Sequence, residues 1–196
     1  MEAILSVLVG VALSATCGFR VFVPLLAVNI GTRAKDADGQ PLIELAAGFD
    51  WLSSDIAMII FLVAAIFEIG GYYIPWIDNL LDTIASPAAI VAGTLITASF
   101  ITGMDPWLQW LLGLIAGGGV AAAVQATTVV TRASSSVTTG GLGNPIVSSV
   151  ETSGAFLGSA LSILAAPFAI GVFVLLLGSG LWIWFRRRNR KLNEAA

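Results

Sequence analysis

The stretch ILSVLVGVALSATCGFRVFVPLLAVNI, Ile4 to Ile30, is apolar over more than the length of a membrane-crossing helix, and it carries Arg20 well inside it. A helix of about 20 apolar residues spans the ~30 Å hydrocarbon core of a bilayer. Gly18 and Pro24 flank the arginine, and both residue types can break a helix. No basic start precedes the run, so we expect a retained segment rather than a cleaved signal. We predict that its helix is broken near Arg20 and either crosses or re-enters the membrane.

The composition indicates a membrane environment for the rest of the chain as well. Of the 196 residues, 57% are hydrophobic and 11% are charged, whereas soluble domains contain about 25% charged residues. The further apolar runs are 56–74, 87–103, 107–130, 146–165 and 167–185. These runs lack the polar and apolar alternation of barrel strands, and helices satisfy their own backbone in lipid. The sequence therefore predicts an all-α, polytopic transmembrane bundle of about six spans.

The basic residues predict an orientation. Five of the nine cations lie within 186–196, and basic residues next to a span stay on the cytoplasmic side. We therefore expect a multi-pass protein of the cell inner (plasma) membrane with a cytoplasmic tail at 186–196. Six spans then place the N-terminus inside and the loop 31–55 outside. A short amphipathic helix is expected over 75–86, where Asp78 and Asp82 share one face.

Two segments of the chain are similar to each other. LLDTIASPAAIVAG at 80–93 aligns with ALSILAAPFAIGVF at 160–173, and a Glu-x-x-Gly element and a lone arginine precede each segment. The matched landmarks are Arg20 with Arg132, Glu68 with Glu151, and Pro87 with Pro167. Three spans per half is an odd number, so the second half would enter the membrane from the opposite side. We predict a 3+3 inverted repeat with halves 1–103 and 104–185; the alternative is a coincidental match.

Ionisable residues inside apolar runs are candidates for function, because each costs about 2.5 to 3.5 kcal/mol at the bilayer centre on insertion scales. The segment 126–154 adds many Ser, Thr and Gly residues and the helix-breaking string GGLGNP. Such broken helices at membrane depth line a cavity or are buried in protein, and a pure packing role is the alternative. We expect a substrate site between the halves formed by Arg20, Glu68, Asp78, Asn79, Asp82, Thr131, Arg132, Ser135, Thr139, Asn144 and Glu151.

The sign of the bound solute stays open at this point. The arginines and helix ends favour an anion, whereas a carboxylate cluster favours a hard cation or a proton relay. Any metal site would use Glu68, Asp78, Asp82 and Glu151. The chain contains no histidine, which removes the usual proton shuttle and the common catalytic triads, so we expect no enzyme activity and no cofactor.

These features favour a small transporter or channel-like carrier for a small ion or anionic solute. The alternatives are a divalent-cation or proton exchanger and a membrane scaffold that transports nothing. The expected partners are the lipid bilayer, the solute and, because six short helices leave little room to rock around a cavity, a second copy in a homodimer. No nucleic acid is expected, since the position of the basic tail beside a span already accounts for its charge.

Three strings resemble a known family: CGFRVFVPLLAV at 17–28, IPWIDNLLDTIASPAAIVAGTL at 74–95 and TRASSSVTTGGLGNPIVSSVE at 131–151. They are similar to the bacterial membrane family DUF4126, and the resemblance covers nearly the whole chain. The family is a domain of unknown function, so it implies no catalytic residues. The two Glu-x-x-Gly elements also loosely resemble the acidic motifs of divalent-cation exchangers, but Gly71 is followed by Tyr72 and Tyr73 instead of the Asp and Lys of those motifs.

Overall fold

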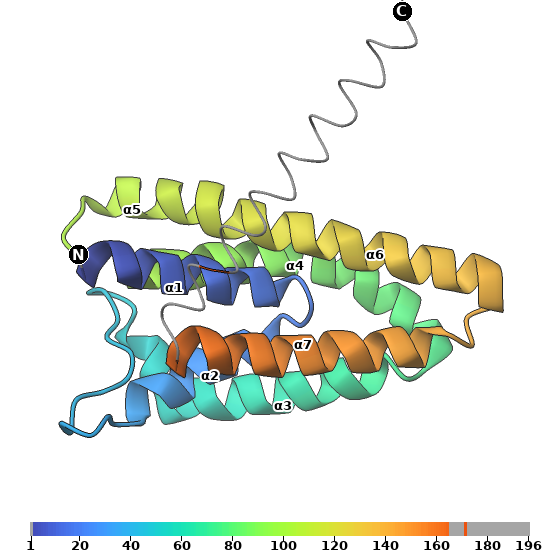
Figure 1. Ribbon diagram of the computed structural model, residues 1–196, viewed down its shortest axis with the longest axis horizontal. Helices are drawn as coiled ribbons and strands as arrows, with labels where there is room; N and C mark the ends of the chain where they lie inside the picture. The colour runs from blue at the N-terminus through green and yellow to red at the C-terminus, as the bar shows by residue number, and fades with distance from the viewer. Residues whose placement is uncertain (1, 165–170, 172–196) are drawn as a thin grey trace, which may run out of the picture.

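The computed structural model describes residues 2–164 and 171, without the side chains at 2, 3, 75, 76, 78 and 79. The predicted sixth span at 167–185 and the basic tail at 186–196 therefore lie outside the described residues, apart from the backbone at 171. The described chain forms a bundle of long, roughly parallel and antiparallel helices (Figure 1). Its elements are α1 (Glu2–Cys17), α2 (Phe22–Arg33), the 3-10 turn η1 (Asp50–Ser53), α3 (Asp55–Gly71), α4 (Pro75–Phe100), α5 (Pro106–Leu112), the π-helical segment η2 (Gly113–Gly118), α6 (Gly119–Thr139) and α7 (Asn144–Leu164).

The predicted all-α class is confirmed, and the helices have membrane character. Three segments are long and apolar enough to cross a bilayer, namely Leu80–Phe100, Pro106–Thr139 and Asn144–Leu164. Large apolar side chains such as Ile56, Phe67, Ile115 and Val130 are exposed on the outer faces of the bundle. Water-soluble proteins seldom expose apolar surface so extensively. The chain is therefore a helical membrane protein.

The first apolar run folds into a helical hairpin. α1 runs antiparallel to α4, because Ser14 donates to the carbonyl oxygen of Gly93 at 2.7 Å while Gly10 lies against Phe100. α2 runs antiparallel to α3, because it begins beside the end of α3 and ends beside its start. Since α3 and α4 are themselves antiparallel, α1 and α2 point in opposite directions. Figure 1 shows this reversal, with α2 returning to the end of the bundle where α1 began.

The hairpin corrects the predicted topology. The break expected near Arg20 is confirmed, since α1 ends at Cys17 and α2 begins at Phe22. However, the N-terminus and the loop after α2 lie at the same end of the bundle (Figure 1), so the prediction that they lie on opposite sides is wrong. The physical reason is the reversal of the chain at 18–21, which returns the run to the end of the bundle where α1 begins.

The fourth apolar run, by contrast, continues as one helical path through α5, η2 and α6. Gly117, Gly118 and Gly119 lie in and beside the π-helical segment, which packs against α4. A Cβ atom on Gly117 would collide with the carbonyl oxygen of Gly93 and with Thr97. The glycines thus allow two helices to approach closely, as small residues do in membranes. This run is neither broken nor re-entrant.

Two further expectations change. The amphipathic helix predicted over 75–86 is the first part of the longer helix α4. The Ser- and Thr-rich segment forms the end of α6 and the start of α7, and the expected break at GGLGNP is the turn at 140–143, where Gly140 and Gly141 have positive φ.

The inverted repeat is not confirmed. The first predicted half begins with a hairpin, whereas the second begins with a continuous helix. Glu68 lies near the end of α3 and Glu151 near the start of α7, so both lie toward the same end of the bundle. The division into halves 1–103 and 104–185 stays a prediction.

Candidate functional site

The tip of the hairpin brings the candidate residues together. Gly18 lies at the end of α1, where a Cβ atom would collide with Val124 and with the backbone nitrogen of Gln125 in α6. Only glycine lets the backbone approach this closely. The tip therefore packs closely against the middle of the continuous helix formed by α5, η2 and α6. Arg20 lies two residues after Gly18.

Glu68 of α3 holds the start of α2. Its Oε1 accepts a hydrogen bond from the backbone nitrogen of Val21 at 2.7 Å, and its Oε2 accepts one from Phe22 at 3.1 Å. The first backbone N–H groups of a helix have no partner within the helix, and this end carries partial positive charge. The buried carboxylate thus provides a cap for α2 from another helix.

Arg20 is completely buried and is bound mainly by α7. Its Nη2 donates to Ser148 Oγ at 2.6 Å and to the Ser148 carbonyl oxygen at 3.0 Å, and its Nε donates to Thr152 Oγ1 at 3.1 Å. Its Nη1 donates to the carbonyl oxygen of Phe19 at 2.9 Å and to Glu151 Oε2 at 3.2 Å. All three guanidinium nitrogens have acceptors, so the arginine has a fixed position.

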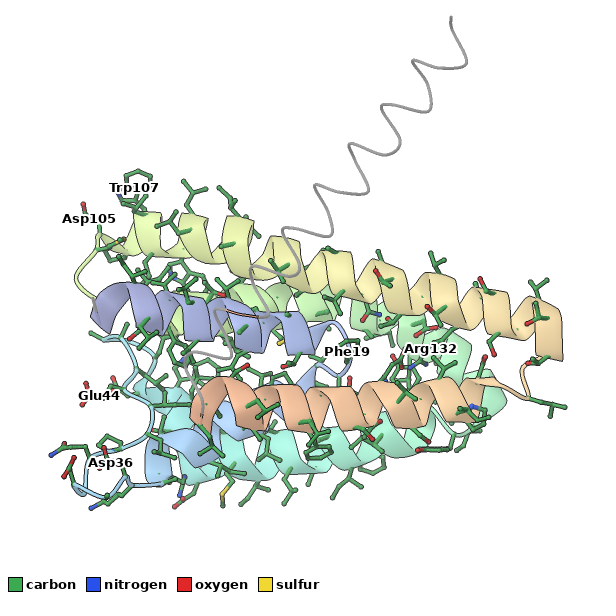
Figure 2. All side chains as sticks on the ribbon, viewed as in Figure 1. Phe19, Asp36, Glu44, Asp105, Trp107 and Arg132 are labelled. Carbon is green, nitrogen blue, oxygen red and sulfur yellow. The ribbon has the colours of Figure 1, made fainter. Side chains whose placement is uncertain are left out.

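Arg132 of α6 reaches the same carboxylate from the other side. Its Nε donates to Glu151 Oε1 at 3.2 Å, its Nη2 pairs with Glu151 Oε2, and its Nη1 lies 3.5 Å from Asp82 Oδ1 of α4. A two-pronged arginine–carboxylate pair of this kind is among the stronger charge-assisted contacts. Figure 2 shows Arg132 between α6 and α7, at the end of the bundle away from Asp36, Glu44 and Asp105.

Tyr72 completes the cluster. The guanidinium carbons of Arg20 and Arg132 lie 4.2 Å and 3.8 Å from the centroid of its ring. The face of an aromatic ring attracts cations, and more so when both are desolvated. We call Arg20, Tyr72, Asp82, Arg132 and Glu151 the arginine cluster.

The structure unites some predicted site residues and separates others. Arg20, Asp82, Arg132 and Glu151 meet directly, and Glu68 lies beside them under the start of α2. Thr131 and Thr139 instead donate to carbonyl oxygens of their own helix, and Asn144 donates to Ser136. Ser135 contributes its carbonyl oxygen to the bond from Thr139. The side chains of Asp78 and Asn79 lie outside the described residues.

Three contributors were not predicted from the sequence: Tyr72, Ser148 and Thr152. Ser148 precedes Glu151 by three residues, and Thr152 follows it directly. Because residues three apart share a helical face, the sequence could have indicated that Ser148 lies beside Glu151. Tyr72 had no such signal, because it stands in the turn after α3.

The metal hypothesis finds no support among the described residues. Within that part of the chain, no group of three or more Cys, Asp or Glu side chains is arranged to hold a metal ion. The guanidinium groups of Arg20 and Arg132 stand beside Glu151, and the carboxylate of Glu68 is taken by the start of α2. Among the four hypothesised ligands, Asp82 and Glu151 are thus paired with arginine and Glu68 with backbone N–H groups, while the side chain of Asp78 lies outside the described residues.

Two apolar cavities flank this region. One of about 270 Å³ lies between the start of α2, α3 and α4, and Glu68 and Tyr72 are among its lining residues. Another of about 330 Å³ lies between α1, α6 and α7, and Phe19 and Gly154 are among its lining residues. Arg20 and Arg132 lie in neither lining. The arginine cluster is thus a largely buried polar site beside apolar cavities, and its member Tyr72 lines the first of them.

Comparison with curated proteins and with solved structures finds no match. A family described as "Domain of unknown function (DUF4126)" matches residues 7–186, which include every residue of the arginine cluster. The match confirms the family resemblance of the three strings and covers most of the chain. The protein belongs to the DUF4126 family.

Proposed function

We propose that this protein is a small membrane carrier for an anionic solute, with the arginine cluster as its binding site. The observation that carries the proposal is the convergence of two buried arginines on the single carboxylate of Glu151. Buried ion pairs add little stability compared with apolar packing, because desolvation offsets most of the attraction. A binding role gives a reason for placing two cations in the interior of a membrane bundle.

The backbone at the hairpin tip also supports a carrier. Interrupted helices at membrane depth are tolerated where they are buried in protein or line a water-filled path. In many transporters, such interrupted helices direct their N-terminal ends and polar side chains at the solute. Here the start of α2 and the side chain of Arg20 lie at the same interruption.

The proposed orientation follows from the basic tail. If residues 167–185 cross the membrane after α7, a cytoplasmic tail puts the end of the bundle that carries the arginine cluster on the cytoplasmic side. The acidic loop after α2 and the N-terminus then both lie outside. Access from the two sides in turn would come from movement between the predicted inverted halves or between the subunits of a homodimer.

A nitrate flux assay tests this function. Nitrate is an anion with more than one equivalent oxygen. Nitric acid is a strong acid, so almost none of it is in the neutral form that could leak across the bilayer. We expect the purified protein in liposomes to take up nitrate, and we expect Arg132→Gln to reduce the rate at least tenfold. Arg33→Gln is the matched control, because Arg33 pairs with Asp55 at 2.7 Å on the exposed opposite end. Uptake no faster than in protein-free liposomes, or an unchanged rate in Arg132→Gln, contradicts the proposal.

A membrane scaffold is the competing function, and one observation favours it. Four of the five donated bonds of Arg20 go to α7 or to its own turn without involving Glu151, which is what a structural lock between the hairpin and α7 requires. A scaffold predicts that Arg132→Gln lowers stability while there is no nitrate flux to lose.

A further inference from the structure

We propose that Glu151 is a built-in competitor for the transported anion, so that an anion enters the arginine cluster together with a proton that neutralises Glu151. This inference rests on the proposed carrier function. It adds a coupling ion and a substrate class, namely monovalent anions that present two oxygens.

The geometry of the carboxylate carries the first step. Its two oxygens are contacted by Arg132 through Nε and Nη2 and by Arg20 through Nη1. These contacts are what a bound planar anion with two oxygens would make. Glu151 is therefore a tethered anion in a two-arginine site, and a free anion of similar shape reproduces its contacts. A spherical ion such as chloride has a single acceptor centre and cannot occupy both oxygen positions at once.

The charges that face Glu151 carry the second step. They are Arg20 at the hairpin turn, Arg132 on α6 and, across Arg132, Asp82 on α4; Tyr72 faces it as a neutral ring. Glu68 on α3 is held by the backbone N–H groups of α2. These described groups comprise two cations and three carboxylates, of which Glu68 also faces the partial positive charge at the start of α2.

The exchange keeps the net charge of the site constant. A proton on Glu151 removes one negative charge and takes away the acceptors of Arg20 and Arg132, which is unfavourable in a buried site, and one monovalent anion restores both the charge and the acceptors. In the exchange, a carboxylate oxygen of Glu151 gains an O–H bond to a proton given up by hydronium, which becomes water. The guanidinium N–H groups then donate to the oxygens of the anion instead of to Glu151. No other covalent bond forms or breaks, so one proton accompanies one anion.

The site keeps its shape when Glu151 withdraws. Arg20 retains its bonds to Ser148, Thr152 and Phe19, and Arg132 retains Asp82. Tyr72 continues to stack under both guanidinium groups. The two arginines are therefore preorganised for an incoming anion, which lowers the cost of binding.

Glu151→Gln is the discriminating variant, because a neutral amide resembles the protonated acid. Liposomes with a pH indicator inside report protons, and a nitrate electrode reports the anion. For the wild type we expect one proton to enter per nitrate and little transport of chloride. For Glu151→Gln we expect nitrate uptake to continue while coupled proton uptake falls to the protein-free level. Asp55→Asn, which removes an exposed carboxylate at the other end, keeps wild-type coupling.

A second measurement protects the test against misfolding of the variant. Nitrate binding to the wild-type protein in detergent should strengthen as pH falls, by up to tenfold per pH unit for one coupled proton. Nitrate uptake without protons in the wild type, or binding that does not change with pH, overturns this inference and leaves the carrier function standing. A wild type that carries no nitrate overturns both.

Discussion

The first and fourth apolar runs are alike in sequence and different in structure. Each is longer than a simple span and contains glycines, and Arg20 lies inside the first run while Arg132 follows the fourth by two residues. Even so, α1–α2 reverses direction while α5–η2–α6 continues. At the reversal, Glu68 caps the new helix α2 from α3. Along the fourth run, the glycines fill a tight contact with α4. The comparison indicates that glycine alone does not break a helix. The helix breaks where a polar side chain, here Glu68, binds the backbone N–H groups that the break leaves without partners.

The two runs also cooperate. The hairpin contributes Arg20 and the continuous helix contributes Arg132, and both arginines bind Glu151 on α7. The broken run places its arginine at a turn, where the side chain reaches α7. The continuous run presents its arginine from the face of a helix. The site therefore combines one arginine from a helix break with one arginine from a continuous helix.

The largest expected effect comes from removing the arginine of the continuous run. Arg132→Ala leaves Glu151 and Asp82 without their shared cation, and breaking a buried pair in this way costs about 3–5 kcal/mol of unfolding free energy. Unfolding by denaturant in micelles measures it. Arg33→Ala, at the exposed pair with Asp55, should cost less than ~1 kcal/mol. Equal losses of unfolding free energy in the two variants would show that Arg132 is not part of a buried, energetically coupled cluster.

A smaller effect is expected at the glycines of the continuous run. Gly117→Ala puts a methyl group onto the backbone of α4, and such overpacking costs about 1–3 kcal/mol. Gly119→Ala is the matched control, since its Cβ position is open and alanine favours a helix by about 1 kcal/mol. The same unfolding assay compares the two. A stable Gly117→Ala protein would mean that the close contact with α4 does not keep this run continuous.

The smallest effect is expected at the cap of the hairpin. Glu68→Ala removes both acceptors from the start of α2, and the loss of a helix cap costs about 0.5–2 kcal/mol. Glu68→Gln keeps one acceptor oxygen and should lose less. Hydrogen exchange at Val21 and Phe22 reports the cap directly and should accelerate in both variants. Unchanged exchange at these two amides would remove Glu68 from the explanation of the reversal.

Part of this arrangement could be predicted from sequence and part could not. Arg20, Glu68, Arg132 and Glu151 stand out because charges in apolar runs need partners. The reversal near Arg20 could not be predicted, because it depends on Glu68, which binds Val21 from 47 residues away, and on the fit of Gly18 against α6. Tyr72, Ser148 and Thr152 depend on the same tertiary contacts. The bonds of Thr131 and Thr139 to the preceding turn of their own helix could not be distinguished from a site role by sequence alone.

The measurement that tests the re-entrant hairpin most directly is side-specific labelling of single cysteines. In a Cys17→Ala background, Glu2→Cys marks the start of α1, Asp38→Cys marks the loop after α2, and Leu142→Cys marks the exposed turn at the opposite end. An impermeant thiol reagent applied to sealed vesicles of one orientation should label positions 2 and 38 from the same side and position 142 from the other. Labelling of positions 2 and 38 from opposite sides would show that the first run crosses the membrane, and would contradict the account.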